Sequence, residues 1–410
     1  MASSPLEIIR TKPEIESERA EFPTNFPDPI DVSAKRYFDP EFYRLEREHV
    51  FKKTWQYVGH REELPNEGDY LLLTELEEPV FLVHGKDGNI NAFFNVCQHR
   101  GSPLVTKPKG NKRVFVCPFH GWTYDQKGGL RGYPEAKNFP RNMGKECLSL
   151  KRVKCESFGP LIFINFDPEA ISLREYLGPV ADEIDPLIGD ASEDCHLAGR
   201  EVFSLRGNWK IAGDANVETY HVPYLHKNTA SPLVDSHRTG QWLLPNGHSR
   251  MLLKFKNKEN AAAPIKRKTF KGLQVNPLPL DGIYSFHLFP NTSIVMAGTD
   301  MYFIISAVPT GPSSMKYIVD YLSHIPRGGK HDAMLDQMVK FNSMVLQEDL
   351  ALVEDMQTAM EQGILTKLKL QYQERRIRRL HEDLDLMIGA DKIEADLQAP
   401  NLLDNFVEER

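Results

Sequence analysis

The feature that most constrains this 410-residue sequence is a pair of short cysteine–histidine motifs. Cys97-Gln-His99 is followed, after 17 intervening residues, by Cys117-Pro-Phe-His120. Each motif closes a run rich in β-branched and aromatic residues and leads into a turn marked by glycine or proline, so each is expected at the tip of a β-hairpin. The pair therefore predicts a small antiparallel β domain that presents four metal-binding side chains from a rigid base.

Three interpretations of this ligand set differ in what it holds. Two cysteines and two histidines are the ligands of a Rieske [2Fe-2S] centre, where histidines replace the thiolates on one iron. A Cys2His2 zinc site uses the same residue types, but a zinc finger usually keeps its cysteines in one pair and its histidines in the other. Buried cysteines beside chance histidines fit the hairpin context least well. The mixed pairs favour the Rieske centre.

A second group of metal-type donors lies between Asn208 and His226. Asp214, Glu218, His221 and His226 place two carboxylates and two imidazoles within this short stretch. On a helix, the first three of these side chains would share one side. Such a density of donors predicts a metal site rather than a solvated helix face.

The spacing of the two histidines requires a bend. On a regular helix the five-residue step from His221 to His226 would splay the two imidazoles apart. Pro223 is expected to push Val222 out of the helical region and so bring both rings to one ion. Two imidazoles and one carboxylate form the facial set of mononuclear non-haem Fe(II), although zinc binds similar donors.

Composition excludes several classes of protein. The chain is 41% hydrophobic and 26% charged, as expected of a globular protein with one large domain or two. Its net charge of −7 argues against a nucleic-acid partner. No apolar run approaches the roughly 18 to 20 residues of a membrane span, and the N-terminus resembles neither a signal nor a transit peptide. The five cysteines are too few for a disulfide framework. A cytoplasmic protein is expected.

The order of predicted elements is α+β and suggests three parts. Residues 1–55 are expected to form an extended arm and an amphipathic helix, and residues 56–165 a small all-β domain of short hairpins. Residues 166–410 combine further strands with two long helices, at about 331–362 and 366–390. The basic run Arg375-Arg-Ile-Arg-Arg is interpreted as a solvated helix face rather than as a docking surface for a reductase.

Together, the two signatures resemble the catalytic α subunit of the Rieske non-haem iron oxygenases, the ring-hydroxylating oxygenase family, over nearly the whole chain. The resemblance implies a Rieske domain inserted before a catalytic domain built on a helix-flanked antiparallel sheet. It also implies that Cys97, His99, Cys117 and His120 hold a [2Fe-2S] cluster. Residues 166–410 then hold a mononuclear Fe(II).

The resemblance assigns His221 and His226 to the mononuclear iron, with an aspartate far downstream on a helix as the third ligand. Asp349 is the candidate, because it shares a predicted helix face with apolar residues and a buried carboxylate needs a partner. Glu348 and Glu354 have more polar neighbours and fit a helix-surface acid better. The apolar residues on the face of Asp349 are Val345, Leu346, Leu352, Val353 and Met356.

Family members pass electrons from the cluster of one subunit to the iron of its neighbour in a trimer. By resemblance Glu218 is the bridge, accepting a hydrogen bond from His221 and another from His120 of the next subunit. Many relatives have aspartate at this position, and glutamate resembles the enzymes that act on carnitine, choline and glycine betaine. Asp214 is expected either to support the ligands from behind or to be a helix-cap or solvated acid.

The implied reaction consumes O2 and electrons. No flavin or nicotinamide fingerprint is present, so a separate NAD(P)H-dependent reductase, a ferredoxin or both must supply the electrons to a homotrimer, with or without a small β subunit. The expected reaction is mono- or cis-dihydroxylation of an aromatic or other apolar compound, as in aromatic hydrocarbon catabolism. The alternatives are oxidative cleavage or demethylation of a quaternary ammonium compound and, in a different class, electron transfer without oxygenase activity.

The substrate pocket is the least defined part of the prediction. Phe286, Leu288, Met296 and Phe303 are candidate lining residues, although each is more simply interpreted as core. An aromatic cage for an ammonium group would have to come from Tyr224, Trp242, Tyr284 and Tyr302. The surrounding Glu-Thr-Tyr-His-Val does not repeat the Glu-Cys-Tyr-His-Cys pattern of the ammonium enzymes, and this favours an apolar substrate.

Overall fold

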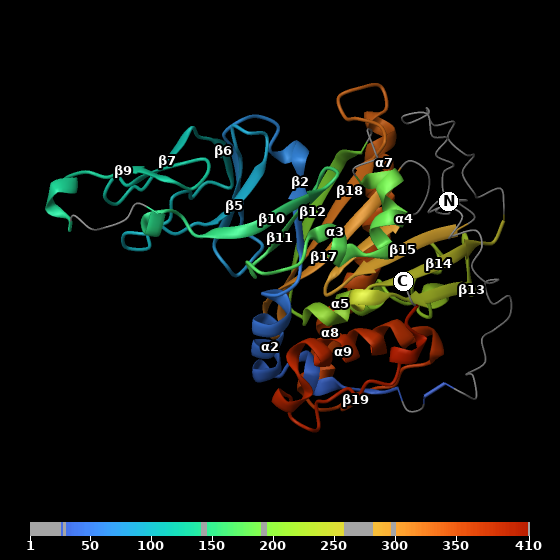
Figure 1. Cartoon of the computed structure of the whole chain (residues 1–410). Helices are drawn as coiled ribbons and strands as arrows, with labels where there is room; N and C mark the ends of the chain where they lie inside the picture. The colour runs from blue at the N-terminus through green and yellow to red at the C-terminus, as the bar shows by residue number, and fades with distance from the viewer. Residues whose placement is uncertain are drawn as a thin grey trace, which may run out of the picture. The chain divides into compact units, whose positions relative to one another are not determined.

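The computed structural model describes residues 26–27, 30–140, 146–189, 195–257, 282–296 and 301–408. The chain divides into two compact units, Lys52–Leu173 and the remainder, Met1–Phe51 with Arg174–Arg410 (Figure 1). Most of the predicted N-terminal arm lies outside the described residues. An all-β unit inserted before a helix-flanked antiparallel sheet confirms the predicted fold class.

The inserted unit contains a seven-stranded and a three-stranded antiparallel sheet. In spatial order the larger sheet is β2 (Gln56–His60), β11 (Leu161–Asn165), β10 (Arg152–Phe158), β5 (Ile90–Phe94), β4 (Val80–His84), β3 (Asp69–Leu73) and β6 (Lys109–Asn111). The smaller sheet is β7 (Val114–Val116), β8 (Thr123–Asp125) and β9 (Leu130–Gly132). The turn between β4 and β5 contains Gly88 at φ +80°, a conformation that glycine adopts without strain.

The second unit is built on one seven-stranded antiparallel sheet. Its spatial order is β12 (His196–Leu205), β18 (Ser314–Ser323), β17 (Met301–Gly311), β16 (Thr292–Met296), β15 (Gly282–Leu288), β14 (Ser249–Phe255) and β13 (Val234–Leu243). Most side chains of β17 and β18 are buried, and many of them are aliphatic or aromatic. Helix α5 (Trp209–Ala215) packs on these two strands. The beginning of the 208–226 stretch is thereby packed against the sheet.

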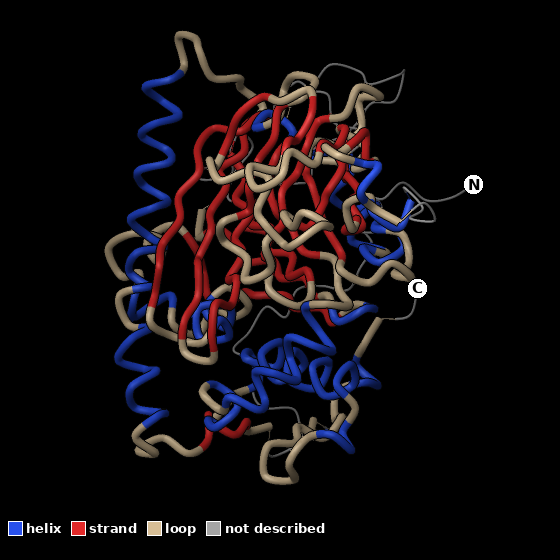
Figure 2. Tube along the Cα trace, turned by 90° about the vertical axis from the view of Figure 1, so that its left-hand side faces the viewer, coloured by secondary structure: helices blue, strands red, loops and turns tan. Residues whose placement is uncertain are grey.

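Helices flank this sheet, and Figure 2 shows the longest of them running alongside the strands. The helices are α2 (Pro40–Glu46), α3 (Leu173–Leu177), α4 (Pro179–Ile188), α6 (Val222–Leu225), α7 (Asp332–Leu350), α8 (Val353–Glu361) and α9 (Arg375–Ile388). A π-helical turn, η2 (Arg47–Phe51), extends α2. The predicted helix at 331–362 is in fact two, α7 and α8, because the chain turns at Ala351 and Leu352. This turn places Asp349 in the last turn of α7.

Short segments complete the two units. β1 (Val32–Ser33) pairs with β19 (Lys367–Leu368) and so joins the segment before α2 to the segment between α8 and α9. The 3-10 turns are η1 (Ala34–Tyr37), η3 (Arg61–Glu63), η4 (Ala136–Asn138), η5 (Glu146–Leu148), η6 (Pro245–Gly247), η8 (Tyr372–Glu374), η9 (Ala390–Lys392) and η10 (Asp404–Phe406). No helix among the described residues is long and apolar enough to span a bilayer.

The basic run of α9 is buried, so its interpretation as a solvated face is wrong. Arg376, Arg378 and Arg379 are each no more than 6% exposed. Arg378 donates to Glu382 and Arg379 to Asp383, each one helical turn further on, while Arg376 donates to backbone carbonyls and to a serine hydroxyl. Since removing a guanidinium from water is costly, these partners are what allow α9 to lie in the interior.

Candidate metal centres and substrate pocket

The 208–226 stretch is mostly irregular rather than helical. Helix α5 ends at Ala215, before Glu218, so the predicted single helix face for Asp214, Glu218 and His221 is wrong. The expectation for Pro223 is wrong as well. Val222 is helical and begins α6, and Pro223 occupies the first turn of that helix, where its missing N–H costs no hydrogen bond. The bend therefore precedes the first histidine, and α6 separates the two.

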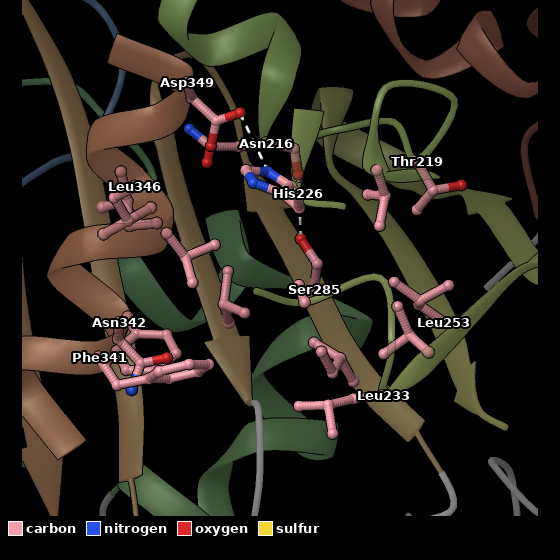
Figure 3. Close-up of a pocket in the computed structure, with 18 of the residues that line it drawn as sticks. Asn216, Thr219, His226, Leu233, Leu253, Ser285, Phe341, Asn342, Leu346 and Asp349 are labelled. Atoms are coloured by element: carbon pink, nitrogen blue, oxygen red, sulfur yellow. Dashed lines mark hydrogen bonds and ion pairs between the residues drawn. The ribbon is translucent and has the colours of Figure 1, made fainter. Parts of the chain in front are cut away.

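Three donors meet at the end of α7. His221 Nε2 lies 3.6 Å and His226 Nε2 3.2 Å from Asp349 Oδ1. Within the described residues, this is the one group of at least three histidine, cysteine or acidic residues whose donor atoms all lie within 4.8 Å of one another. Figure 3 shows Asp349 facing His226 across the top of a cavity. The structure thus brings together the three residues that the sequence analysis singled out.

The chemistry of these donors fits a metal ion. Asp349 Oδ1 is buried and has no hydrogen-bond partner, although two imidazole nitrogens lie close to it. A buried, unpaired carboxylate oxygen is costly unless a cation balances it. Two imidazoles and one carboxylate that face a cavity leave coordination positions free, as in non-haem Fe(II) sites.

The ring of His221 is held by Glu218. Glu218 Oε1 accepts the hydrogen bond from Nδ1, and its Oε2 accepts from the backbone N–H groups of Tyr220 and His221. Burial lowers the pKa of the imidazole, but Glu218 and Asp349 outweigh it and leave that pKa above its ordinary value. With Nδ1 engaged in this way, Nε2 is the nitrogen that points to the metal position.

The ring of His226 is held by Glu348. Its Nδ1 donates to Glu348 Oε2 at 2.7 Å, and the Thr229 hydroxyl donates to the same oxygen at 2.7 Å. Burial tends to raise the pKa of Glu348, but His226 and Thr229 outweigh it and leave that pKa below its ordinary value. The interpretation of Glu348 as a helix-surface acid is therefore wrong. No local signal marks this role, since its partners lie about 120 residues earlier in the chain.

Asp214 is buried but does not touch the three donors. Its Oδ2 accepts a 2.6 Å hydrogen bond from the Tyr37 hydroxyl, which also lies 2.8 Å from His381 Nε2. Burial raises the pKa of Asp214 to about 8, despite the Tyr37 hydrogen bond and the charge of Lys210. Asp214 therefore belongs to an interior polar network and is not a solvated acid.

In the inserted unit, the four predicted cluster ligands lie at the tips of two loops. Cys97 and Cys117 are buried, with relative exposures of 1% and 2%. His99 Nδ1 and His120 Nδ1 lie 3.1 Å apart, and His99 stacks on the Trp122 ring at 4.9 Å. The side chains are thus paired by type, thiol with thiol and imidazole with imidazole. A [2Fe-2S] cluster with one iron on each pair fits this arrangement.

The surroundings of the two thiols differ. Burial raises the pKa of Cys117, but the backbone N–H groups of Phe119 and His120 outweigh it and leave that pKa below its ordinary value. Burial also raises the pKa of Cys97. The Tyr124 hydroxyl, 3.4 Å from its Sγ, lowers that pKa by less than burial raises it, so the pKa of Cys97 stays above its ordinary value. Donors aimed at the sulfurs stabilise thiolate ligands and tune a cluster.

A cavity of about 560 Å³ extends from the three donors between α7 and the sheet (Figure 3). The sheet contributes mostly apolar side chains, including Met251, Leu253, Val295, Met301, Phe303 and Ile305. Helix α7 adds five further apolar side chains to the lining. Its polar lining residues are Gln337, Asn342 and Asp349. Among the described residues, no lysine, arginine, tyrosine or tryptophan lines the cavity.

The outcome for the predicted pocket residues is mixed. Phe303 lines the cavity, whereas Phe286, Leu288 and Met296 are buried elsewhere in the core. None of the four residues considered for an aromatic cage lines it. These four are Tyr224, Trp242, Tyr284 and Tyr302.

Comparison with known proteins places both units in families. Residues 54–154 match the model of the Rieske [2Fe-2S] domain, and residues 192–390 match that of the ring hydroxylating alpha subunit catalytic domain. Among curated proteins, the α subunit of 2-aminobenzenesulfonate 2,3-dioxygenase from an Alcaligenes species is 29% identical over 308 residues, 74% of this chain and 76% of that one. Chloroplastic choline monooxygenase from Atriplex hortensis is 28% identical over 342 residues, 82% of this chain and 72% of that one.

Among solved structures, a quaternary ammonium Rieske monooxygenase, studied for carnitine oxidation by gut microbiota, superposes with a TM-score of 0.72 at 22% identity. The match covers 92% of this chain and 100% of that one. This similarity shows the fold. The two family models match the two units in their order along the chain, and the solved structure spans both of them. The chain therefore belongs to the Rieske non-haem iron oxygenases, as a catalytic subunit that is an oxidoreductase with a [2Fe-2S] cluster and a mononuclear iron.

Proposed function

We propose that this Rieske terminal oxygenase hydroxylates an uncharged aromatic or other apolar compound, with electrons from a separate reductase or ferredoxin. The observation that carries the proposal is the apolar cavity that opens directly onto His221, His226 and Asp349. Cavities of this size, with mostly apolar walls and a few polar groups, are typical of small-molecule sites.

The charges of the cavity argue against an aromatic acid. A buried carboxylate or sulfonate needs a cation, usually arginine, and no cation is found among the described lining residues. The lining carboxylates, Glu218 and Asp349, would repel such a substrate. Asn342, Gln337 and Ser285 offer only neutral hydrogen-bonding groups. A hydrocarbon or a neutral heteroaromatic compound matches this lining.

A quaternary ammonium compound is the second candidate. It is favoured by glutamate at position 218 and by similarity to a plant choline monooxygenase. Three phenylalanines, Phe255, Phe303 and Phe341, line the cavity, and an aromatic face attracts a cation. Against it, the larger aromatics that bind cations best do not line the described wall, and Glu218 is already engaged by His221 and two backbone N–H groups.

The proposed roles of the residues follow from their positions. His221, His226 and Asp349 would hold the iron, which supplies O2 activation when bound. Glu218 and Glu348 fix the two imidazoles with Nε2 toward the metal position. The apolar walls of the cavity exclude water and orient the substrate carbon toward that position.

We also propose a homotrimer in which the cluster of one subunit serves the iron of its neighbour through Glu218. His120 is exposed at its loop tip, and the adjacent Phe119 is 54% exposed. Beside Glu218, Tyr220 and Tyr224 are 53% and 76% exposed. Exposed aromatic side chains at both candidate ends suit a contact between copies of the chain. In the same proposal, residues 1–55, 56–165 and 166–410 are the arm, cluster and catalytic parts.

A substrate panel with a surrogate reductase tests the proposed function. The purified chain is offered neutral aromatics such as naphthalene and indole, aromatic acids, and the set of choline, carnitine and betaine. Product and O2 uptake are measured together, because uptake without product signals uncoupled turnover. We expect coupled turnover in the first group. Conversion of methylammonium compounds alone would overturn the apolar-substrate proposal and favour the second candidate.

A further inference from the structure

We propose that Glu348 is a positioning residue for the mononuclear iron, acting through His226. This inference rests on the proposed function, in which His221, His226 and Asp349 hold that iron. It adds a residue whose Oε2 contacts the ring nitrogen of His226 that does not face Asp349.

Two consecutive carboxylates of α7 face opposite nitrogens of the His226 ring. Asp349 Oδ1 lies 3.2 Å from Nε2, and Glu348 Oε2 lies 2.7 Å from Nδ1. Neighbouring residues on a helix point about 100° apart, so their side chains can reach around one flat ring. The end of α7 thus holds the imidazole by both of its nitrogens.

The contact with Glu348 determines the tautomer of His226. A carboxylate only accepts hydrogen bonds, so when Nε2 of a neutral His226 binds a metal ion, the ring proton lies on Nδ1 and Glu348 accepts it. Thr229 donates to the same oxygen and keeps the carboxylate in place. The ring itself is only 5% exposed. Glu348 itself is 28% exposed, so it closes the Nδ1 side of the ring toward solvent.

The two histidines are held in different ways. Glu218 lies three residues before His221, so that pair is set by one local turn. Glu348 lies 122 residues after His226 and reaches it only when α7 is docked. The same helix lines the cavity with residues that include Phe341 and Asn342. Glu348 therefore links the geometry of one iron ligand to the helix that contacts the substrate.

The expected consequence is on metal affinity and ligand geometry. Loss of a carboxylate that orients a metal-binding histidine typically costs about 10- to 100-fold in metal affinity or activity. Glu348→Ala is expected to weaken Fe(II) binding at the mononuclear site by a factor in this range. Glu348→Gln keeps an oxygen acceptor but loses the charge, so its effect should fall between wild type and Glu348→Ala.

The test uses the full chain with its cluster intact. Glu348→Ala, Glu348→Gln and Thr229→Val are compared with Glu354→Ala, a control that replaces an exposed glutamate in the first turn of α8. Iron retained at the mononuclear site against a chelator series is measured beside acid-labile sulfide, which counts the clusters. The EPR spectrum of the nitric oxide adduct of the ferrous site reports its symmetry, which a general loss of stability would leave unchanged.

We expect Glu348→Ala to lose iron at lower chelator concentration and to change the nitric oxide spectrum, with an unchanged visible spectrum of the cluster. Thr229→Val should shift both readouts in the same direction by less, and Glu354→Ala should match wild type. Equal iron retention and equal spectra for all four variants would overturn the role of Glu348. If Glu348→Ala does not fold, wild-type behaviour of Glu348→Gln and Thr229→Val overturns it. A wild-type chain that takes up no iron beyond its cluster would instead remove the proposed function.

Discussion

The two metal centres are built in opposite ways. The proposed cluster ligands Cys97, His99, Cys117 and His120 come from two loop tips within 24 residues of sequence. The proposed iron ligands come from an irregular stretch between α5 and β13 and from the end of α7, more than 120 residues later. One centre is local, whereas the other exists only once the sheet and α7 have assembled.

Because of this difference, the two metal centres should respond differently to substitutions. A ligand in a hairpin is held by its neighbours in the chain, so damage to it should stay within the inserted unit. The mononuclear site depends on helix docking, so residues far from the ion, such as Glu348, affect it. The following changes test this contrast, in order of expected effect.

The largest effect is expected from Cys97→Ser. The buried serine cannot replace the thiolate as a soft ligand, so the cluster and its visible absorbance should be lost and turnover with any electron donor should fall below detection. Because the two centres are built separately, about one iron per chain should remain. Parallel loss of the mononuclear iron would contradict the independence of the two centres.

Asp349→Ala is the converse change. Removing a direct ligand should lower turnover by more than about 100-fold, beyond the loss typical of residues that act through a ligand. The cluster should keep its visible spectrum and still be reduced by the donor, which stopped-flow absorbance can follow. Turnover within tenfold of wild type would remove Asp349 from the ligand set.

Glu218→Gln should have a smaller and more selective effect. The amide can still accept the His221 hydrogen bond, so both metals should remain, but loss of the bridging charge should slow electron delivery by about tenfold or more. Single-turnover oxidation of the reduced cluster in the presence of O2 and substrate measures this step. Unchanged kinetics would exclude Glu218 as the bridge.

The smallest effect on activity is expected from Asp214→Asn, which should instead change the pH dependence of stability. Burial raises the pKa of Asp214 to about 8 from 3.8, so the folded chain keeps a proton that the unfolded chain releases. The free energy of unfolding should therefore fall as pH rises from about 4 to about 8, by at most about 1.4 kcal/mol per pH unit from this group. The asparagine variant lacks this slope.

Urea unfolding at pH 5 and pH 8 measures this difference. The stability of Asp214→Asn relative to wild type should improve at the higher pH, while turnover changes less than about twofold because Asp214 contacts none of the iron ligands. Parallel pH profiles for the two proteins would show that this carboxyl is not buried as described.

The sequence predicted what is local. The Cys97 and Cys117 motifs and the short hairpins of residues 56–165 carry their own structural signal, because turn chemistry and strand periodicity act over a few residues. The apolar face predicted for Asp349 is correct only within α7. Val345 and Leu346 line the cavity, whereas Leu352 and Met356 lie beyond the end of α7 and are each 45% exposed. Family resemblance then related these pieces to one another.

The rest depends on contacts that no short segment encodes. Glu348 is interpreted from the sequence as a surface acid, because its partners, His226 and Thr229, are distant in the chain. The sequence also carries no sign that Arg376 and Arg378 are buried, because the backbone carbonyls that they contact, those of Val217, Ser249, Asp31 and Pro400, lie on other segments. Strands β13 and β18 were not anticipated. Pro223 was expected to break a helix but begins one, because the preceding helix ends earlier than its composition suggests.

The central claim is that one chain carries a histidine-ligated [2Fe-2S] cluster and a separate ferrous ion. Iron and acid-labile sulfide are measured on the loaded wild-type protein, together with its EPR spectrum after reduction. About three irons for every two sulfides, with a reduced-cluster signal of the Rieske type, is the predicted result. Two irons or fewer for every two sulfides, or a colourless protein without a signal, would contradict the account.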